Sequence, residues 1–243
     1  MRLFEAKDLT KKYDKTVLNH LDFSIDEGEV VGIIGVSGCG KSTLARLVSG
    51  IEKPSSGSLL YQGKTVDFKK SRKDIQLILQ NPIESFSPRI KIKQFLYEPY
   101  HYFYHLNKKE AMTAIKKILE QVGMDETCLG KYPHELSGGQ LQRISIARAL
   151  IIQPQLLICD EITSSLDQVI QRDIIELLKQ CVYKYHMAIL FVSHDLSLVH
   201  EFCHQVLVLK NDGKIIEKGT IQQLYKSENE VVQNLLKAAY LNG

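Results

Sequence analysis

The segment Gly35-Val-Ser-Gly-Cys-Gly-Lys-Ser42 fits the pattern G-x-x-x-x-G-K-[ST]. It directly follows the apolar, β-branched run of residues 30–34 and precedes a helical segment, which is the context that a phosphate-binding loop requires. The glycines let the backbone present its N–H groups to phosphate oxygens, Lys41 can reach the β- and γ-phosphates, and the Ser42 hydroxyl can coordinate Mg²⁺. A chance glycine-rich turn is the weaker alternative. The predicted phosphate-binding residues are Gly35, Val36, Ser37, Gly38, Cys39, Gly40, Lys41, Ser42 and Thr43.

Two acidic residues follow a second apolar run, residues 156–159. Asp160 can hold the Mg²⁺ shell through water, and Glu161 is placed where a carboxylate could act as general base on an attacking water. Taken alone, an acidic pair at the end of a strand is as often a helix N-cap or a solvated turn. The upstream glycine-rich loop favours the catalytic interpretation.

A third pattern is Leu136-Ser-Gly-Gly-Gln140. Ser137, Gly138 and Gly139 are expected to open a helix, whose free N–H groups and positive dipole end would suit an anion. An ordinary Ser N-cap beside a flexible Gly-Gly pair is the alternative for the pentapeptide alone.

Together with Gln80 and His194, these motifs resemble, in order and over nearly the whole chain, the ATP-binding cassette (ABC) ATPases. The resemblance implies ATP and Mg²⁺ as ligands, with Ser42, Gln80 and Asp160 around the metal and Glu161, His194 and Gln80 as catalytic residues. It further implies that Tyr13 stacks on adenine, although a lone Tyr after a strand is more often packing, and His194 alone would more often be structural. In the family the signature, Leu136 to Gln140, faces ATP held by a second subunit, and a loop matching Ser165, Leu166 and Asp167 crosses the dimer interface.

Two segments indicate a branch of that family. Gln80-Asn-Pro-Ile-Glu-Ser-Phe-Ser-Pro-Arg89 is similar to a segment of peptide and nickel importer ATPases, with Asn81, Phe86 and Ser87 as departures, and Tyr132-Pro-His-Glu135 is also similar to that branch. Ile162 and Ser165 depart from the usual proline and alanine, but neither change removes a polar group needed for hydrolysis.

The implied function is ATP-driven uptake of nickel, a metal–metallophore complex or oligopeptide. The implied partners are a paralogous ATPase chain (or a second copy of this one), two membrane permease subunits and, indirectly, an extracytoplasmic solute-binding protein, at the cytoplasmic face of the cell membrane. Nucleic acid is not expected as a partner. The alternatives are another importer or exporter class, or an ABC ATPase that acts on nucleic acid or ribosomes.

The elements that must position these residues form an α/β pattern. Apolar runs at residues 30–34, 156–159 and 188–192 predict a parallel sheet, because each is followed by a polar loop and then by helical periodicity. Residues 75–79 are a further apolar strand, which Gln80 ends. Alternating residues at 3–9 and 17–25 predict a small antiparallel sheet, and strands at 205–209 and 214–218 are joined by a hairpin turn before two short terminal helices.

Residues 92–152 carry almost no strand pattern and are expected to be helical. A stripe on one helical face marks that segment: Ala111, Ile115, Ile118, Leu119 and Val122. Pro82, Pro88, Pro99, Pro133 and Pro154 are expected to mark loops. We therefore expect one ABC ATPase domain over residues 1–243, with a catalytic lobe of residues 1–90 and 153–243 and a helical signature subdomain of residues 91–152.

The composition of the chain limits the class of protein to which it can belong. The 243 residues are 44% hydrophobic and 24% charged with a net charge of +3, which is ordinary for a folded protein and too weakly basic to indicate nucleic-acid binding. No apolar run approaches the roughly 18 residues of a membrane span, and the start lacks the apolar region of a secretion signal. Five scattered cysteines favour reduced thiols, and the pairs His101/His105 and His200/His204 are more plausibly packed than metal-binding.

Overall fold

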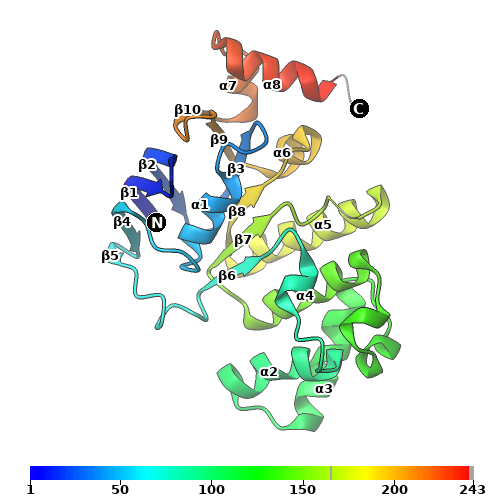
Figure 1. The fold of residues 1–243 in the computed structure, drawn as a ribbon. Coiled ribbons are helices and arrows are strands. Elements are labelled where there is room, and N and C mark those ends of the chain that lie inside the picture. The colour runs from blue at the N-terminus through cyan, green and yellow to red at the C-terminus, as the bar shows by residue number, and fades with distance from the viewer. Residues whose placement is uncertain (165, 241–243) are drawn as a thin grey trace.

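The computed structural model describes residues 1–164 and 166–240, with an α/β architecture (Figure 1). A six-stranded sheet has the order β10-β9-β3-β8-β7-β6, in which only the β9–β10 pair is antiparallel. Its strands are β3 (Val30–Gly35), β6 (Ile75–Ile78), β7 (Leu156–Asp160), β8 (Ala188–Val192), β9 (Gln205–Leu209) and β10 (Ile215–Gly219). The predicted parallel sheet is confirmed.

The central strands of this sheet are buried on both faces. Along β7, Leu156 and Ile158 belong to one core cluster while Leu157 and Cys159 belong to the other. Because successive side chains of a strand point to opposite faces, a continuously apolar strand feeds two separate cores. One core lies toward the antiparallel sheet and α1 (Lys41–Val48), and the other lies toward α5 (Gln168–Tyr185) and the helices inserted between β6 and β7.

A second, antiparallel sheet has the order β2-β1-β4-β5. Its strands are β1 (Arg2–Lys12), β2 (Thr16–Asp26), β4 (Ser56–Tyr61) and β5 (Lys64–Thr65). The first two were expected from their alternation, whereas β4 and β5 were not. In β4 the backbone of Gly57 passes so near β1 that a Cβ atom there would lie 2.2 Å from the Asp8 carbonyl oxygen. Pairing with β1, not an apolar pattern of its own, makes this segment a strand.

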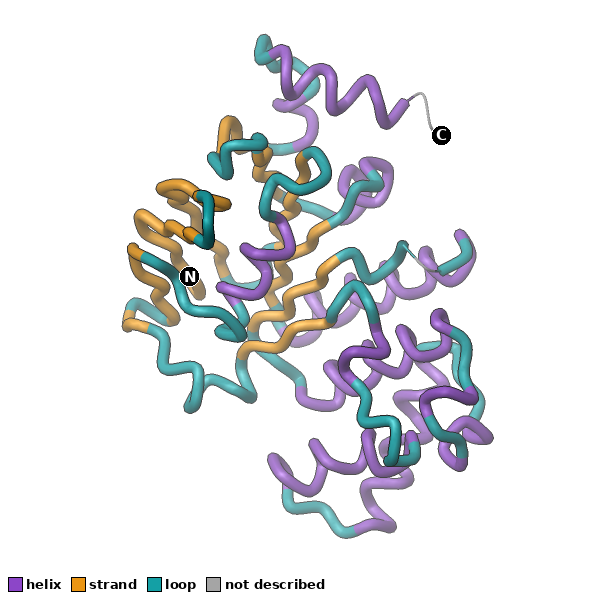
Figure 2. Tube along the Cα trace, viewed as in Figure 1, coloured by secondary structure: helices purple, strands orange, loops and turns teal. Residues whose placement is uncertain are grey.

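The inserted helices gather at one end of the molecule, beyond β6 (Figure 1 and Figure 2). They are α2 (Ile92–Tyr104), α3 (Lys108–Gln121) and α4 (Gly138–Ile152), with short 3₁₀ turns at Pro82–Ser85, Glu126–Gly130 and Pro133–Glu135. The Asn107 side chain accepts the N–H groups of Lys109 and Glu110 and so caps α3. The predicted stripe faces the core, with Ile118 only half-buried.

Pro99 does not mark a loop, because it lies buried inside α2. A proline within a helix removes the N–H that would bond to the carbonyl four residues earlier, here that of Phe95. Arg148 of α4 donates to the Phe95 carbonyl instead, its guanidinium lies 4.3 Å from the centre of the Phe95 ring, and it bonds Glu98 at 2.7 Å. A donor from a neighbouring helix thus replaces the missing backbone bond.

The remaining helices are α5 (Gln168–Tyr185), α6 (Leu196–Phe202), α7 (Ile221–Leu224) and α8 (Glu230–Tyr240). Within the described residues, the helices are all too short or too polar to span a bilayer. All five cysteines are free thiols.

Candidate functional site

The candidate site lies where four neighbouring parallel strands end. The order β3-β8-β7-β6 brings the loops after these strands to one edge of the sheet. They form a pocket of ≈ 480 Å³, here called the phosphate pocket. Its lining residues are Val17, Gly35, Ser37, Gly38, Gly40, Lys41, Ser42, Thr43, Gln80, Glu161 and His194.

Glycine is required at two points of the loop between β3 and α1. Gly40 has φ 103° in the left-handed region, and a Cβ atom there would lie 2.8 Å from Leu18 Cδ2. A Cβ atom at Gly35 would lie 2.5 Å from the Leu209 carbonyl oxygen. Helix α1 begins at Lys41, so its first N–H groups, which have no partner within a helix, face the pocket.

The Lys41 ammonium is almost buried and lies folded over this loop. It donates to the carbonyl oxygens of Gly35 at 2.8 Å and Val36 at 3.1 Å. Val36 and Cys39 do not line the phosphate pocket. The Cys39 thiol is buried, which raises its pKa, and its N–H donates to Val36. These two residues therefore contribute backbone rather than side chain to the loop.

Ser42 and Asp160 place two oxygens side by side. The Ser42 hydroxyl donates to Asp160 Oδ1 at 3.2 Å, and Asp160 is 3% exposed. Burial raises the pKa of that carboxyl, while the hydrogen bond from Ser42 lowers it. A hydroxyl and a carboxylate oxygen are hard ligands of the kind that Mg²⁺ takes when phosphates and water complete its shell, so these residues fit that ion.

Three predicted catalytic residues meet above the loop. Glu161 Oε2 accepts a 2.6 Å hydrogen bond from Gln80 Nε2 and lies 3.6 Å from His194 Nδ1. Glu161 has φ 50°, an unusual left-handed conformation for a residue with a Cβ atom, and its N–H donates to the Val192 carbonyl at 3.0 Å. The backbone of β8 thus fixes the turn that aims the Glu161 carboxylate into the phosphate pocket.

Tyr13 lies in the turn between β1 and β2, where it is 49% exposed. Its hydroxyl donates to the Glu52 carboxylate and also interacts with the side chain of Thr43, which lines the phosphate pocket. The ring is therefore held at the edge of the phosphate pocket.

The signature residues do not line the phosphate pocket. Ser137 caps α4, where its hydroxyl accepts the Gln140 N–H at 3.3 Å and Gln140 Oε1 accepts the Ser137 N–H at 3.0 Å. A Cβ atom on Gly138 would meet nothing within 4 Å, so the start of α4 faces open space. Asp167 caps α5 by accepting the Ile170 N–H, Leu166 is half-buried, and Ser165 lies outside the described residues.

Comparison with known proteins agrees with this geometry. The sequence model of the ABC transporter family matches residues 18–164, more than half of the chain. The chain belongs to the ABC transporter family. It is an ABC-type ATPase with the α/β cassette fold, as expected.

Among the relatives of this ABC ATPase, the nickel import ATP-binding protein NikE of Shigella boydii is 39% identical, and the match covers 95% of this chain and 89% of that protein. NikE of Escherichia coli K12 is 38% identical with the same coverage. The ATP-binding cassette MJ0796, in a dimeric post-hydrolysis state with ADP and phosphate, matches with a TM-score of 0.83 and 27% identity over 90% of this chain and 99% of that one. The cassette cbiO1 of Clostridium perfringens, part of the transporter complex cbiONQ, matches with a TM-score of 0.78 and 29% identity. The match covers 99% of this chain and 98% of that one.

Sequence reasoning missed two residues of this ABC site. Val17 lines the phosphate pocket from β2, and Glu52 bonds Tyr13. Val17 could be read only as one apolar position of an alternating strand. Nothing in the residues around Glu52 marks it, because its contact with Tyr13 spans a long stretch of chain.

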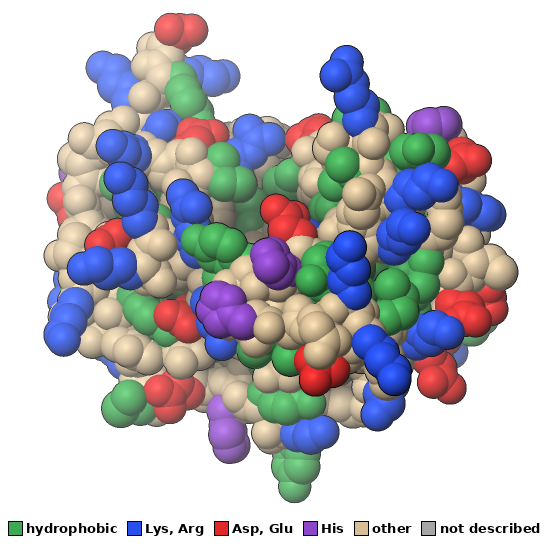
Figure 3. Space-filling model, turned by 90° about the horizontal axis from the view of Figure 1, so that it is seen from below, with side chains coloured by type: hydrophobic (Ala, Val, Ile, Leu, Met, Phe, Trp, Pro, Cys, Tyr) green, Lys and Arg blue, Asp and Glu red, His purple; other side chains and the backbone are tan. Residues whose placement is uncertain are grey.

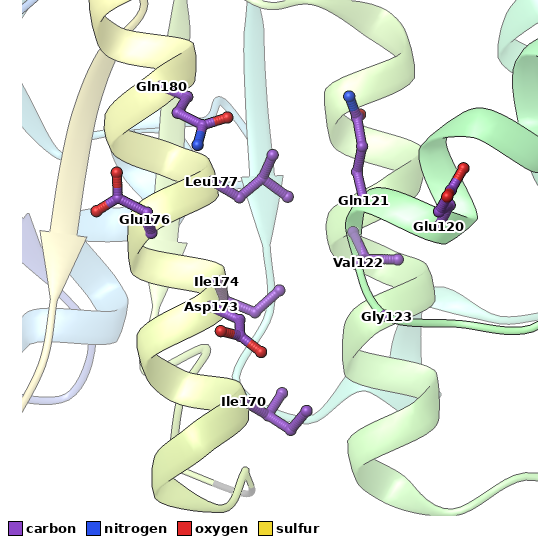
Figure 4. A pocket seen from close by; sticks show the side chains of 10 residues that line it. All are labelled: Glu120, Gln121, Val122, Gly123, Ile170, Asp173, Ile174, Glu176, Leu177 and Gln180. Carbon is purple, nitrogen blue, oxygen red and sulfur yellow. The ribbon is translucent and has the colours of Figure 1, made fainter.

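A second cleft separates the inserted helices of this ABC ATPase from α5 (Figure 4). Side chains of α5 face the end of α3 across a volume of ≈ 340 Å³. Its lining residues are Glu120, Gln121, Val122, Gly123, Ile170, Asp173, Ile174, Glu176, Leu177 and Gln180. None of the predicted site residues lies there.

The two histidine pairs make ordinary contacts. The His101 ring stacks on Tyr97 with centroids 5.7 Å apart, His200 lies against Tyr225, and His204 Nδ1 accepts the Val30 N–H at 2.8 Å. Within residues 1–164 and 166–240, no three His, Cys, Asp or Glu side chains gather in a way that could hold a metal ion.

Proposed function

We propose that this chain is the ATP-hydrolysing subunit of an importer that takes up nickel, as the ion or as a metal–metallophore complex, through a separate membrane permease. The 39% identity to a nickel import ATP-binding protein over 95% of the chain supports the cargo. The meeting of Gln80, Glu161 and His194 beside the phosphate-binding loop is the observation that carries hydrolysis.

ATP binds with its phosphates on the loop of residues 35–43 and its adenine on the Tyr13 ring. Lys41 exchanges its two carbonyl partners for phosphate oxygens, and the N–H groups at the start of α1 complete the cradle. Ser42, Asp160 and Gln80 would hold Mg²⁺, which when bound would neutralise negative charge on the phosphates. The predicted site residues fit these roles.

Glu161 acts as the general base. Its carboxylate takes a proton from the attacking water as the water oxygen bonds to the γ-phosphorus and the bond to the β–γ bridging oxygen breaks. Gln80 orients the carboxylate and the water, and His194 stabilises the charge that develops on the γ-phosphate oxygens. The 2.6 Å and 3.6 Å contacts of Glu161 with these two residues support this division of roles.

The signature residues, Leu136 to Gln140, serve the ATP of a second cassette. Their separation from the phosphate pocket of their own chain, and the open space before α4, support this role. Leu166 and Asp167 would line the same interface. The second cassette is a paralogous chain or another copy of this one, and ATP closes the pair because it contacts both chains only in the closed state.

We further propose that residues after Gln80 receive a cytoplasmic segment of the permease, so that closure of the two cassettes moves the membrane subunits. The chain would then work at the cytoplasmic face of the membrane, and an extracytoplasmic binding protein would deliver the cargo to the permease. The inserted helices, residues 91–152, would form the lobe that moves against the catalytic residues 1–90 and 153–243.

Oligopeptide is the second candidate cargo, because residues 80–89 resemble peptide as well as nickel importers. A nucleic-acid partner finds less support. The net charge is only +3, and on the face shown in Figure 3 basic side chains are interspersed with acidic and apolar ones.

Uptake measurements test the cargo. The chain is coexpressed with its candidate permease and partner ATPase, and cells are assayed for accumulation of nickel, nickel–metallophore complex and a labelled oligopeptide. We expect nickel accumulation that is lost with Glu161→Gln and kept with the exposed control Glu228→Gln. Peptide uptake without nickel uptake would assign the second candidate, and copurification with ribosomes or DNA instead of a permease would overturn transport.

A further inference from the structure

The turn that carries Tyr13 is tied to the segment of residues 52–55. Ser55 Oγ accepts the Lys12 N–H at 2.9 Å and donates to the Lys12 carbonyl at 3.3 Å. Lys11 Nζ donates to the Lys53 carbonyl at 2.9 Å. These bonds fix the backbone on which the Tyr13 side chain stands, but they leave its ring free to rotate.

The ring itself is held by a group of four side chains, here called the Tyr13 clamp: Lys11, Tyr13, Arg46 and Glu52. The Tyr13 hydroxyl donates to the Glu52 carboxylate, which lies 3.2 Å from Lys11 Nζ and 3.8 Å from the guanidinium of Arg46. Lys11 Nζ also lies 4.8 Å from the centre of the Tyr13 ring. Arg46 belongs to α1, the helix that begins in the phosphate-binding loop, so the clamp joins the two ends of the nucleotide site.

The Glu52 carboxylate of the Tyr13 clamp is ionised and shielded from solvent, which strengthens its hydrogen bond with Tyr13. The hydrogen bond from Tyr13, followed by the effect of Lys11, lowers the pKa of the Glu52 carboxyl, so it is ionised at neutral pH. The Glu52 and Lys11 side chains are only 20% and 14% exposed, although Tyr13 is half-exposed. A charge-assisted hydrogen bond in such a shielded place is stronger than one on an open surface.

We propose that Glu52 is a positioning residue for the purine base: through the Tyr13 hydroxyl it holds the phenol ring beside Thr43, in the orientation that receives adenine, before nucleotide arrives. The proposal rests on the function given above, in which Tyr13 stacks on adenine. An exposed ring that is already ordered loses less rotamer freedom on binding, so Glu52 raises the affinity for ATP without touching the ligand itself.

The test compares two ligands that differ by the nucleoside. ATP and inorganic triphosphate are titrated against the full chain and its variants. We expect Tyr13→Phe and Glu52→Ala each to weaken ATP binding about three- to tenfold, with triphosphate binding unchanged. The double variant should bind ATP no more weakly than either single variant, because both changes remove the same hydrogen bond.

Glu5→Ala is the matched control. Glu5 is a β1 carboxylate with 17% side-chain exposure and two cationic neighbours, Arg2 and Lys7, and it does not line the phosphate pocket. Its substitution should leave the affinity for both ligands unchanged. Should Glu52→Ala fold poorly, Tyr13→Phe still decides, because it removes a single hydroxyl from a half-exposed ring.

The outcomes separate the clamp from the adenine contact. Wild-type ATP affinity in Tyr13→Phe, or equal losses for ATP and triphosphate, would overturn the clamp. Additive losses in the double variant would overturn it as well. If Tyr13→Ala binds ATP as tightly as the wild type, the adenine contact itself is wrong. If Tyr13→Ala weakens ATP but Tyr13→Phe does not, the adenine contact stands without the clamp.

Discussion

At the scale of single residues, the proposed hydrolysis depends on the Glu161 carboxylate, which residues at three strand ends position. Glu161 follows β7, its N–H bonds to the end of β8, and its side chain meets Gln80, which lies beyond β6. A left-handed φ at a residue with a Cβ atom costs free energy, and tertiary contacts must supply it. The arrangement places the Glu161 carboxylate in the phosphate pocket, where the proposed function needs a base.

Glu161→Gln tests that role. The amide keeps the size of the side chain but cannot accept a proton, so ATP hydrolysis should fall by about 10²-fold or more while ATP binding is retained. Phosphate release measures the first quantity, and titration with a fluorescent ATP analogue measures the second. Unchanged turnover would reject Glu161 as the base.

Asp160→Asn tests the cost of burying a charge. Burial raises the pKa of Asp160 above its value in the unfolded chain. The contribution of this carboxyl to the free energy of unfolding is therefore greatest at low pH. It declines as the pH rises from the unfolded-state pKa through the folded-state pKa. Without metal and nucleotide at neutral pH, the neutral Asn variant should therefore melt at a higher temperature than the wild type.

The same substitution should weaken stabilisation by Mg²⁺-ATP, because an amide oxygen is a poorer ligand than a carboxylate. Melting curves from acid to neutral pH, with and without Mg²⁺-ATP, check both effects. A melting temperature that is lower at neutral pH without ligand would contradict the first.

The candidate site was predictable where a residue belongs to a local motif. Gly35, Lys41 and Ser42 form a contiguous pattern next to an apolar strand, so the sequence alone locates the loop. The contact between Gln80 and Glu161 was not predictable from their separate motifs, because it depends on the strand order. Glu52 was missed for the same reason: its role comes from contacts made across the fold.

At the scale of elements, a side chain of α4 supplies a hydrogen bond that the backbone of α2 cannot make. Arg148 donates to the Phe95 carbonyl, whose usual helical donor is missing because position 99 is proline. Leaving that carbonyl without a donor costs about 1–3 kcal/mol in a buried place. The inserted helices are therefore held together by a polar contact as well as by their apolar faces.

Arg148→Ala should accordingly lower the free energy of unfolding by about 1–3 kcal/mol. In a Pro99→Ala background the loss should be smaller, because the introduced alanine brings the N–H that α2 lacks. Urea unfolding of the two single variants and the double variant measures this coupling. Arg143→Ala is the control: Arg143 also donates from α4 to a carbonyl, that of Gly123, and its cost should not depend on position 99. Equal costs of Arg148→Ala in both backgrounds would contradict the explanation.

Strands and helices could be predicted from the sequence where their apolar pattern matches the faces that the fold buries. Strands β3, β7 and β8 are continuously apolar because both faces are buried, and the stripe of α3 gives its helical period. Strand β4 is half-exposed and begins Ser-Gly-Ser, so its pairing with β1 comes from tertiary contact. The prediction that Pro99 marks a loop is wrong, because the donor that compensates for its missing N–H lies on another helix.

At the scale of the whole molecule, two candidate anion sites lie apart on one chain. The phosphate pocket is at the strand ends, and the start of α4 faces open space without lining it. The cleft of Figure 4 runs between α5 and the inserted helices that carry the signature. This separation is what the proposed pairing with a second chain requires, because the signature of one chain would then serve the ATP of the other.

Gly138→Asp tests this arrangement. A side chain there meets no neighbour, and an acid at the start of a helix is favourable, so the variant should fold as the wild type does. It should bind ATP normally, because residue 138 does not line the phosphate pocket of its own chain. Hydrolysis by the assembled pair should fall about tenfold or more, through repulsion of the partner-held γ-phosphate. Equal losses of binding and turnover would instead place the signature beside the ATP of its own chain.

The resting position of Lys41 has a consequence for repeated cycles. Its ammonium is nearly buried and donates to two carbonyl oxygens of its own loop, those of Gly35 and Val36. A buried charge without partners would penalise the release of product, since departure of phosphate would strand it. Because the two carbonyl acceptors belong to the loop itself, the Lys41 ammonium would keep hydrogen-bond partners after phosphate departs, and product release would need no replacement anion.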